Sequence, residues 1–239
     1  MEKLVYLIWD RPSRDPEDLR TQFLADIGPR ILANDARALE LHLDDGDAQV
    51  PTMVKVPDDE LPVRAAVSVW LDNHDTRGAI EAILGEVGIR RAGYLVTESL
   101  YRDYGDNEHA DRRDWADGER SPGIVMLTIF DKPQGMDDDT FYAHWYGHQS
   151  PMSEWMQPRC RYVRNAVVRA ITAGAPRYKA LVAEAWPTAE HLTDLPTFFG
   201  AADGSEIGER IRIMLDSTKL LFDPATMRCY TLSEYILKS

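Results

Sequence analysis

Cysteine and basic residues are scarce in this sequence, and each shortage excludes a class of protein. The 239 residues include two cysteines, Cys160 and Cys229, in no CxxC pair, so neither a zinc knuckle nor a thioredoxin-like motif is indicated. We expect both to be buried free thiols in a reducing compartment. Lysine and arginine number 27 against 40 acidic residues, and the net charge of −13 disfavours a phosphate backbone or an anionic membrane as a partner.

Long apolar runs and nucleotide-binding motifs are also missing. No segment approaches the roughly 18 apolar residues that a transmembrane helix needs, and the opening MEKLVYLIWDRP lacks a signal-peptide pattern. No GxGxxG, P-loop or GxSxG sequence is present. We therefore expect a cytoplasmic protein that binds neither nucleic acid nor membrane and that works without a cofactor.

The sequence does contain one order of elements twice. Apolar periodicity predicts strands and helices in the order βαββαβ, which is the ferredoxin-like unit. A polar segment without periodicity, residues 102–122, then predicts a linker, after which the same order begins again. The first set of strands is 3–12, 38–43, 65–73 and 94–101, with helices at 15–32 and 75–89. The second set is 123–133, 160–171, 180–188 and 229–237, with helices at 136–155 and 205–222.

Small landmarks repeat in the same order in both halves and favour an internal duplication. The first strand of each half ends in Asp-basic-Pro. The matched pairs are Trp70 with Trp186, Tyr94 with Tyr230, and Glu98 with Glu234.

One βαββαβ sheet leaves a face uncovered, and two fused units can pack those faces together. We therefore predict an α+β fold in which two fused ferredoxin-like units form a pseudo-symmetric α+β barrel. The predicted divisions are 1–101, a linker at 102–122, and 123–239. The chain could be a monomer with an internal pseudo-dimer or could form a homodimer.

The second half carries a recognisable motif in the stretch FYAHWYGHQSPMSEW. Phe141, Trp145, His148 and Pro151 form an F-x-x-x-W-x-x-H-x-x-P pattern, after FDKPQGM and before RCRYVRN. Over residues 123–172 this resembles the EthD family of the dimeric α+β barrel superfamily. The resemblance implies an enzyme among relatives that include cyclases, isomerases, decarboxylases, dehydratases and monooxygenases.

Aligning the halves on Pro29 and Pro151 shows what the first half lacks. Leu19 then lies opposite Phe141, Phe23 opposite Trp145, and Asp26 opposite His148. The first half keeps the apolar stripe without a histidine. We expect the candidate site in the second half only, with a degenerate site in the first.

His148 is the leading catalytic candidate. It follows Phe141 and Trp145 on one helical stripe, where apolar neighbours would keep it a neutral base, although a structural, hydrogen-bonded histidine is the alternative. His144 lies one turn earlier and is either an exposed polar residue or a substrate contact. The two histidines could share a metal ion, but a third ligand would have to come from another element, such as Glu184, and no local residue indicates one, so we expect no metal.

Glu184 is the second catalytic candidate, because it shares a mostly apolar strand face with Val182 and Trp186. It either pairs with an arginine, or orients His148 or a substrate hydroxyl. The expected substrate-binding residues are Trp145, Tyr162, Trp186, Tyr230 and His144, although the aromatic ones could equally be packing residues of the sheet.

These residues predict a cofactor-independent lyase or isomerase. Its substrate would be a small, apolar, aromatic or polyketide-like carbonyl compound, and its reaction would move a proton beside the carbonyl. An oxygenase or other oxidoreductase acting on a small organic compound is the first alternative. A non-catalytic small-molecule-binding or accessory protein is the second.

Overall fold

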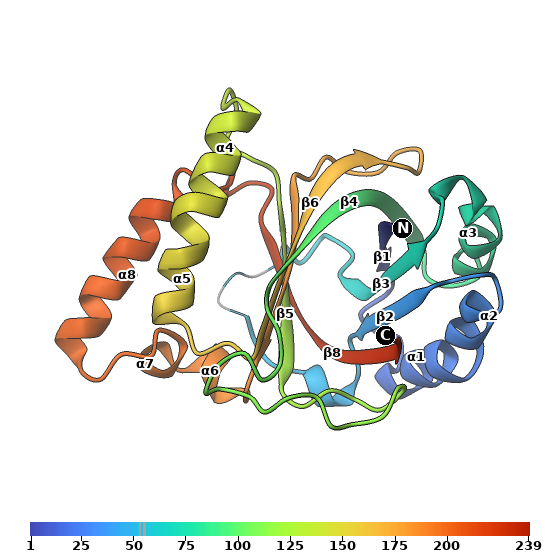
Figure 1. Cartoon of the computed structure of the whole chain (residues 1–239), viewed down its shortest axis with the longest axis horizontal. Helices are drawn as coiled ribbons and strands as arrows, with labels where there is room; N and C mark the ends of the chain where they lie inside the picture. The colour runs from blue at the N-terminus through green and yellow to red at the C-terminus, as the bar shows by residue number, and fades with distance from the viewer. Residues whose placement is uncertain (53, 55) are drawn as a thin grey trace.

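The computed structural model describes every residue except 53 and 55, and its centre is a closed barrel of eight antiparallel strands (Figure 1). Around the barrel the strands follow the order β1-β3-β2-β8-β5-β7-β6-β4. Their bounds are β1 Glu2–Trp9, β2 Ala38–Leu43, β3 Val63–Leu71, β4 Arg90–Arg102, β5 Ile124–Phe130, β6 Arg161–Ala170, β7 Ala180–Trp186 and β8 Arg228–Lys238. The predicted α+β barrel is confirmed.

Each half of the chain contributes four neighbouring strands. The first half gives β4-β1-β3-β2 and the second gives β8-β5-β7-β6, which is the same relative order. The two sheets join where β2 pairs with β8 and where β4 pairs with β6. The halves therefore share one strand order, and their origin by tandem duplication stays a prediction.

The main helix of each half is interrupted by one π-helical turn. In the first half α1 (Pro16–Gln22), η1 (Phe23–Ile27) and α2 (Gly28–Leu32) are continuous, and in the second α4 (Asp138–His144), η4 (Trp145–Gln149) and α5 (Ser150–Met156) are continuous. Asp15 and Asp137 cap these helices by accepting from backbone N–H groups of the first turn. The π turns η1 and η4 fall at matching places in the two halves.

The remaining helices are shorter, except for α8. They are η2 (Gly46–Ala48), η3 (His74–Arg77), α3 (Gly78–Leu84), α6 (Glu190–Thr193), α7 (Leu195–Phe198) and α8 (Gly204–Thr218). Figure 1 shows α1, α2 and α3 on one side of the barrel and α4, α5 and α8 on the other. No helix in the described part of the chain is both long and apolar enough to cross a membrane.

Strand alternation divides the apolar residues between the barrel interior and the helix-covered faces. On β1, Val5 and Leu7 face the interior, whereas Tyr6 packs against the helices of the first half. The same alternation shows that one of the residue pairs matched between the halves, Trp70 with Trp186, is wrong. Trp70 points away from the helices, beside Lys3 at 4.5 Å, whereas Trp186 packs beneath them, so the two tryptophans are not structurally equivalent.

The segment between β4 and β5 is ordered by its aromatic residues. Tyr104 is buried and packs edge-on against Trp115, with 4.9 Å between ring centroids. Backbone N–H groups of Gly118 and Ser121 donate to carbonyls of β8. The segment therefore packs against the barrel, although it contains no helix or strand longer than one bridge.

Candidate active site

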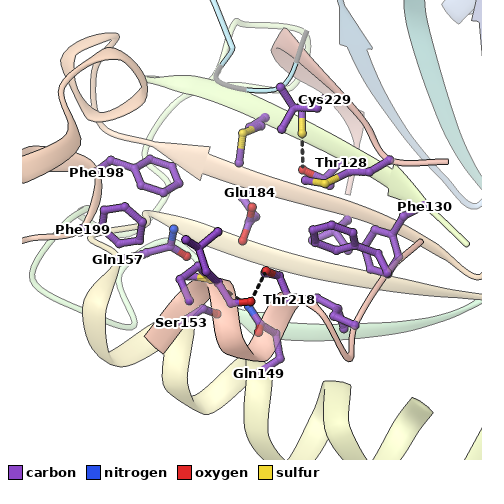
Figure 2. A pocket seen from close by; sticks show the side chains of 18 of the residues that line it. Thr128, Phe130, Gln149, Ser153, Gln157, Glu184, Phe198, Phe199, Thr218 and Cys229 are labelled. Atoms are coloured by element: carbon purple, nitrogen blue, oxygen red, sulfur yellow. Dashed lines mark hydrogen bonds between the residues drawn. The ribbon is translucent and has the colours of Figure 1, made fainter. Parts of the chain in front are cut away.

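A cavity of about 560 Å³ separates the outer face of the second-half sheet from its helices (Figure 2). Met126, Thr128 and Phe130 of β5 contribute alternate side chains to its floor. The opposite wall comes from η4, α5, α7 and α8, and from the turn after α8. The corresponding face of the first half is filled instead, because Phe23 and Ile27 pack against Tyr6 with no exposed surface.

Glu184 is the only charged side chain among the described residues that line this cavity. It lies on β7, and Figure 2 shows its carboxylate pointing from the sheet toward Gln149, Ser153 and Gln157 of the helical wall. A lone carboxylate in an apolar cavity needs a buried counter-charge.

Arg159 supplies that counter-charge from the short turn between α5 and β6. Its side chain is fully buried, and Nη1 donates to Oε1 of Glu184. Nη2 donates to Ser153 Oγ at 3.1 Å and to Glu154 Oε2 at 3.0 Å, and the guanidinium lies 4.0 Å from the centre of the Tyr162 ring. Burial lowers the pKa of Arg159, but Glu184, Tyr162 and Glu154 together outweigh this effect, so the net pKa is raised. The ion pair therefore fixes the Glu184 carboxylate.

The other polar groups around the cavity are neutral. Gln149 accepts from Ser217 Oγ at 2.6 Å, and its Nε2 lies 3.4 Å from Met214 Sδ. The thiol of Cys229 lies 3.5 Å from the Thr128 hydroxyl, and burial raises its pKa to about 12, so it stays protonated near neutral pH. These groups can hydrogen-bond a ligand without adding charge.

The helical stripe predicted that His148 faces the cavity, but the structure places His148 outside it. His148 is exposed, and Gln149 takes the inward position instead. The cause is η4, in which the N–H of Ser150 bonds to the carbonyl of Trp145, five residues earlier. The wider turn rotates the helix so that the fourth residue after Trp145, and not the third, faces the sheet. The matching π turn of the first half, η1, has the same effect, because Asp26 is exposed and the next residue, Ile27, is buried.

His144 also lies outside the cavity. Its Nε2 donates to the backbone oxygen of Ser217 at 2.9 Å and lies 3.1 Å from the Ser217 hydroxyl. A carbonyl oxygen only accepts, so Nε2 carries the proton. His144 thus ties α4 to α8, and nothing in its contacts supports a role with substrate or with a metal ion.

The structure brings together three of the seven residues predicted for the site and leaves four outside it, of which His148 and His144 are described above. Trp145, Tyr162 and Glu184 line the cavity. Trp186 does not line it and stacks behind Phe198, which does, with ring centroids 4.7 Å apart. Tyr230 is turned into the barrel core, because adjacent residues of β8 face opposite sides, and borders a separate cavity of about 360 Å³.

Sequence reasoning missed Arg159, Gln149 and Gln157. Arg159 was hidden because a turn residue is normally exposed, and the unpaired Glu184 on an apolar strand was the only signal that a buried arginine was needed. Gln149 ends the π turn and Gln157 is the extended residue that follows α5, so the inward position of Gln149 becomes visible only once the π turn is known.

No protein-family model and no curated protein matches this chain. Solved structures do resemble it. One described as an anthrone oxidase-like protein aligns with a TM-score of 0.60 and 8% identity, covering 100% of this chain and 94% of that one. Another, a candidate monooxygenase from Fusobacterium nucleatum, aligns with a TM-score of 0.51 and 9% identity, covering 99% and 92%. At this identity the likeness establishes the fold alone, an eight-stranded antiparallel barrel with helices outside it.

Proposed function

We propose that this protein is an enzyme that oxidises a small, neutral, aromatic carbonyl compound with molecular oxygen inside the second-half cavity. The observation that carries the proposal is the single carboxylate of Glu184, fixed by buried Arg159, in an otherwise apolar and aromatic cavity. The volume of about 560 Å³ falls within the range of small-molecule sites. No described cationic side chain lines the cavity, which favours a neutral substrate over an anionic one.

Glu184 supplies a hydrogen-bond acceptor and a base. A carboxylate can take a proton from a CH₂ group that aromatic rings connect to the ketone carbonyl, because the resulting charge is delocalised through the rings onto the carbonyl oxygen. Gln149 and Gln157 offer amide N–H groups to the ketone oxygen that gains this charge. Trp145 and Tyr162 supply the flat apolar walls that hold the rings.

The electron-rich carbanion then reacts with dioxygen. A carbon–oxygen bond forms, the peroxide takes up the proton, and loss of water breaks the O–O bond and leaves a new carbonyl group. A CH₂ group and O₂ thus become C=O and H₂O, with one oxygen atom in each product. The substrate supplies all four electrons, so the step consumes no further reductant.

Two finer proposals accompany this function. The structure described as anthrone oxidase-like supports the choice of a tricyclic aryl ketone as the substrate class, and the motif of the second half supports membership of the EthD family. We also propose that residues 1–101 and 123–239 are duplicated ferredoxin-like units joined by 102–122. In each half the fourth, first, third and second strands lie side by side in that order.

Oxygen uptake by the purified protein with anthrone as the probe tests the function. We expect one O₂ consumed for each quinone formed, above the rate without protein. Isotopic exchange of the CH₂ protons with solvent, without oxygen uptake, would instead support the lyase or isomerase chemistry expected from the sequence, because Glu184 could perform that proton transfer too. Binding without turnover would support the non-catalytic alternative and contradict the proposal.

A further inference from the structure

A second cluster of titratable groups lies inside the barrel, on the sheet face opposite to the proposed active site. Glu40 and His42 project inward from β2, and Glu234 projects inward from β8, directly opposite His42 in the antiparallel pair. Each of the three residues is 3% exposed. The cluster therefore sits at the seam where the first half of the barrel meets the second.

The imidazole of His42 has a nitrogen that the rest of the cluster does not satisfy. Nε2 lies 3.2 Å from Glu40 Oε1 and 3.5 Å from Glu234 Oε2, yet it makes no hydrogen bond with any described residue. A buried ring nitrogen aimed at two carboxylates has no solvent to compensate it. The arrangement suits a cation shared by all three side chains.

The net negative charge around the cluster also favours a bound cation. Arg161 donates to Glu40 at 2.9 Å and to Glu234 at 2.7 Å, and it pairs with Asp103 at 3.1 Å. With His42 neutral, the buried carboxylates of Glu40 and Glu234 and the Arg161 guanidinium leave a local charge of −1, and the half-exposed Asp103 makes it −2. A bound divalent cation would offset this negative charge, most of which is buried.

The spacing of the three donors matches a metal site. One ligand atom from each side chain lies within 4.8 Å of the other two. Ligands roughly 2.0–2.2 Å from a tetrahedral ion lie roughly 3.3–3.6 Å from one another, close to the two distances from His42. One imidazole and two carboxylates suit Zn²⁺ and similar transition-metal ions. Arg161, together with Tyr104, which donates to Glu234 at 3.0 Å, would orient the carboxylates from outside.

We propose that Glu40, His42 and Glu234 bind a divalent transition-metal ion that ties β2 to β8. A cavity of about 250 Å³, bordered by Glu40 and Arg161 at one end of the barrel, provides a path for the ion. The site is structural, because its ligands face the barrel interior whereas Glu184 faces the helices.

Calorimetric titration of the chelator-treated full-length protein with Zn²⁺ tests this site. We expect one equivalent bound and a Tm raised by about 5–10 °C when free zinc is 100 times Kd. His42→Gln and Glu234→Gln should each weaken binding by roughly 100-fold or more. His148→Ala, which removes an exposed histidine, should leave binding unchanged.

Cobalt as a probe keeps the test decisive if the two glutamine variants do not fold. Wild-type protein should then show intense visible absorption from low-coordinate Co²⁺, lost on adding one equivalent of Zn²⁺. The proposal is overturned by the absence of stoichiometric zinc binding and of this absorption, or by full binding in a folded His42→Gln. Oxygen uptake is a separate measurement, so failure of one proposal is distinguishable from failure of the other.

Discussion

Arg159 donates to Glu184 from a guanidinium that has no exposed surface, although it belongs to a turn between a helix and a strand. Its other hydrogen bonds reach Ser153 and Glu154 on α5. The ion pair thus joins the helix, the turn and β7 at the wall of the cavity. It holds the proposed base in place and also compensates the buried charge of that base.

Replacing Arg159 with Met should therefore destabilise the fold strongly. Glu184 would remain as a buried carboxylate without its counter-charge, at a cost of about 3–5 kcal/mol in the free energy of unfolding. The double variant Arg159→Met with Glu184→Leu should recover much of this loss, because neither charge remains. Urea unfolding measures both, and a single variant within 1 kcal/mol of wild type would contradict the buried ion pair.

Filling the cavity should remove ligand binding without unfolding the protein. Val182→Phe would extend a side chain of the cavity floor into space, so we expect loss of binding with little change in stability. Val67→Phe is the matched control, because Val67 is fully buried in the filled core of the first half. That overpacking should cost about 1–3 kcal/mol. Equal destabilisation of the two variants would show that the cavity is not open space.

The two histidines of the aromatic helix should differ in their effects on stability. His144→Ala removes the hydrogen bond to the Ser217 carbonyl between α4 and α8, which should cost about 1 kcal/mol. His148→Ala removes an exposed side chain and should change stability by less than about 0.5 kcal/mol. Thermal unfolding compares the variants, and a larger loss for His148→Ala would contradict the π-helical register.

Both cysteines should resist alkylation in the folded protein. Burial raises the pKa of Cys160 to about 11 and that of Cys229 to about 12, so at pH 8 roughly one thiol in a thousand or fewer is the reactive thiolate. Because the thiol pKa values are higher in the folded state than in the unfolded state, where they are about 8.5, their contribution to stability is fully present below about pH 8.5. It is lost as the pH rises toward the pKa values of the folded protein. Mass spectrometry after iodoacetamide treatment should find no adduct without denaturant and two with it. Rapid native labelling would mean that the thiols are accessible.

The repeated βαββαβ order could be predicted from sequence because each element carries a local signal. Strands alternate, and Asp15 and Asp137 accept from N–H groups of the first helical turn, as capping residues do. Closure of the barrel followed from the need to cover two open sheet faces. The predicted equivalence of Trp70 and Trp186 was wrong, because identical residues at corresponding positions of two strands do not reveal toward which side of the sheet each side chain points.

The site was harder to predict because its key features are not local. In a regular helix both the third and the fourth residue after Trp145 can share its face, so periodicity does not decide between His148 and Gln149. The π turn decides, and it has no composition signal. Glu184 was identifiable as a polar residue on an apolar strand, but its partner Arg159 depends on how the turn folds back onto β7.

The most direct test of the central claim is the rate of oxygen uptake with anthrone, compared between wild type, Glu184→Gln and His148→Ala. Glu184→Gln preserves size and should lower kcat/KM by roughly 100-fold or more, since the amide does not accept the substrate proton. His148→Ala should match wild type, because His148 lies outside the cavity. Equal rates for wild type and Glu184→Gln, or a large loss in His148→Ala, would contradict the assignment of Glu184 as the base.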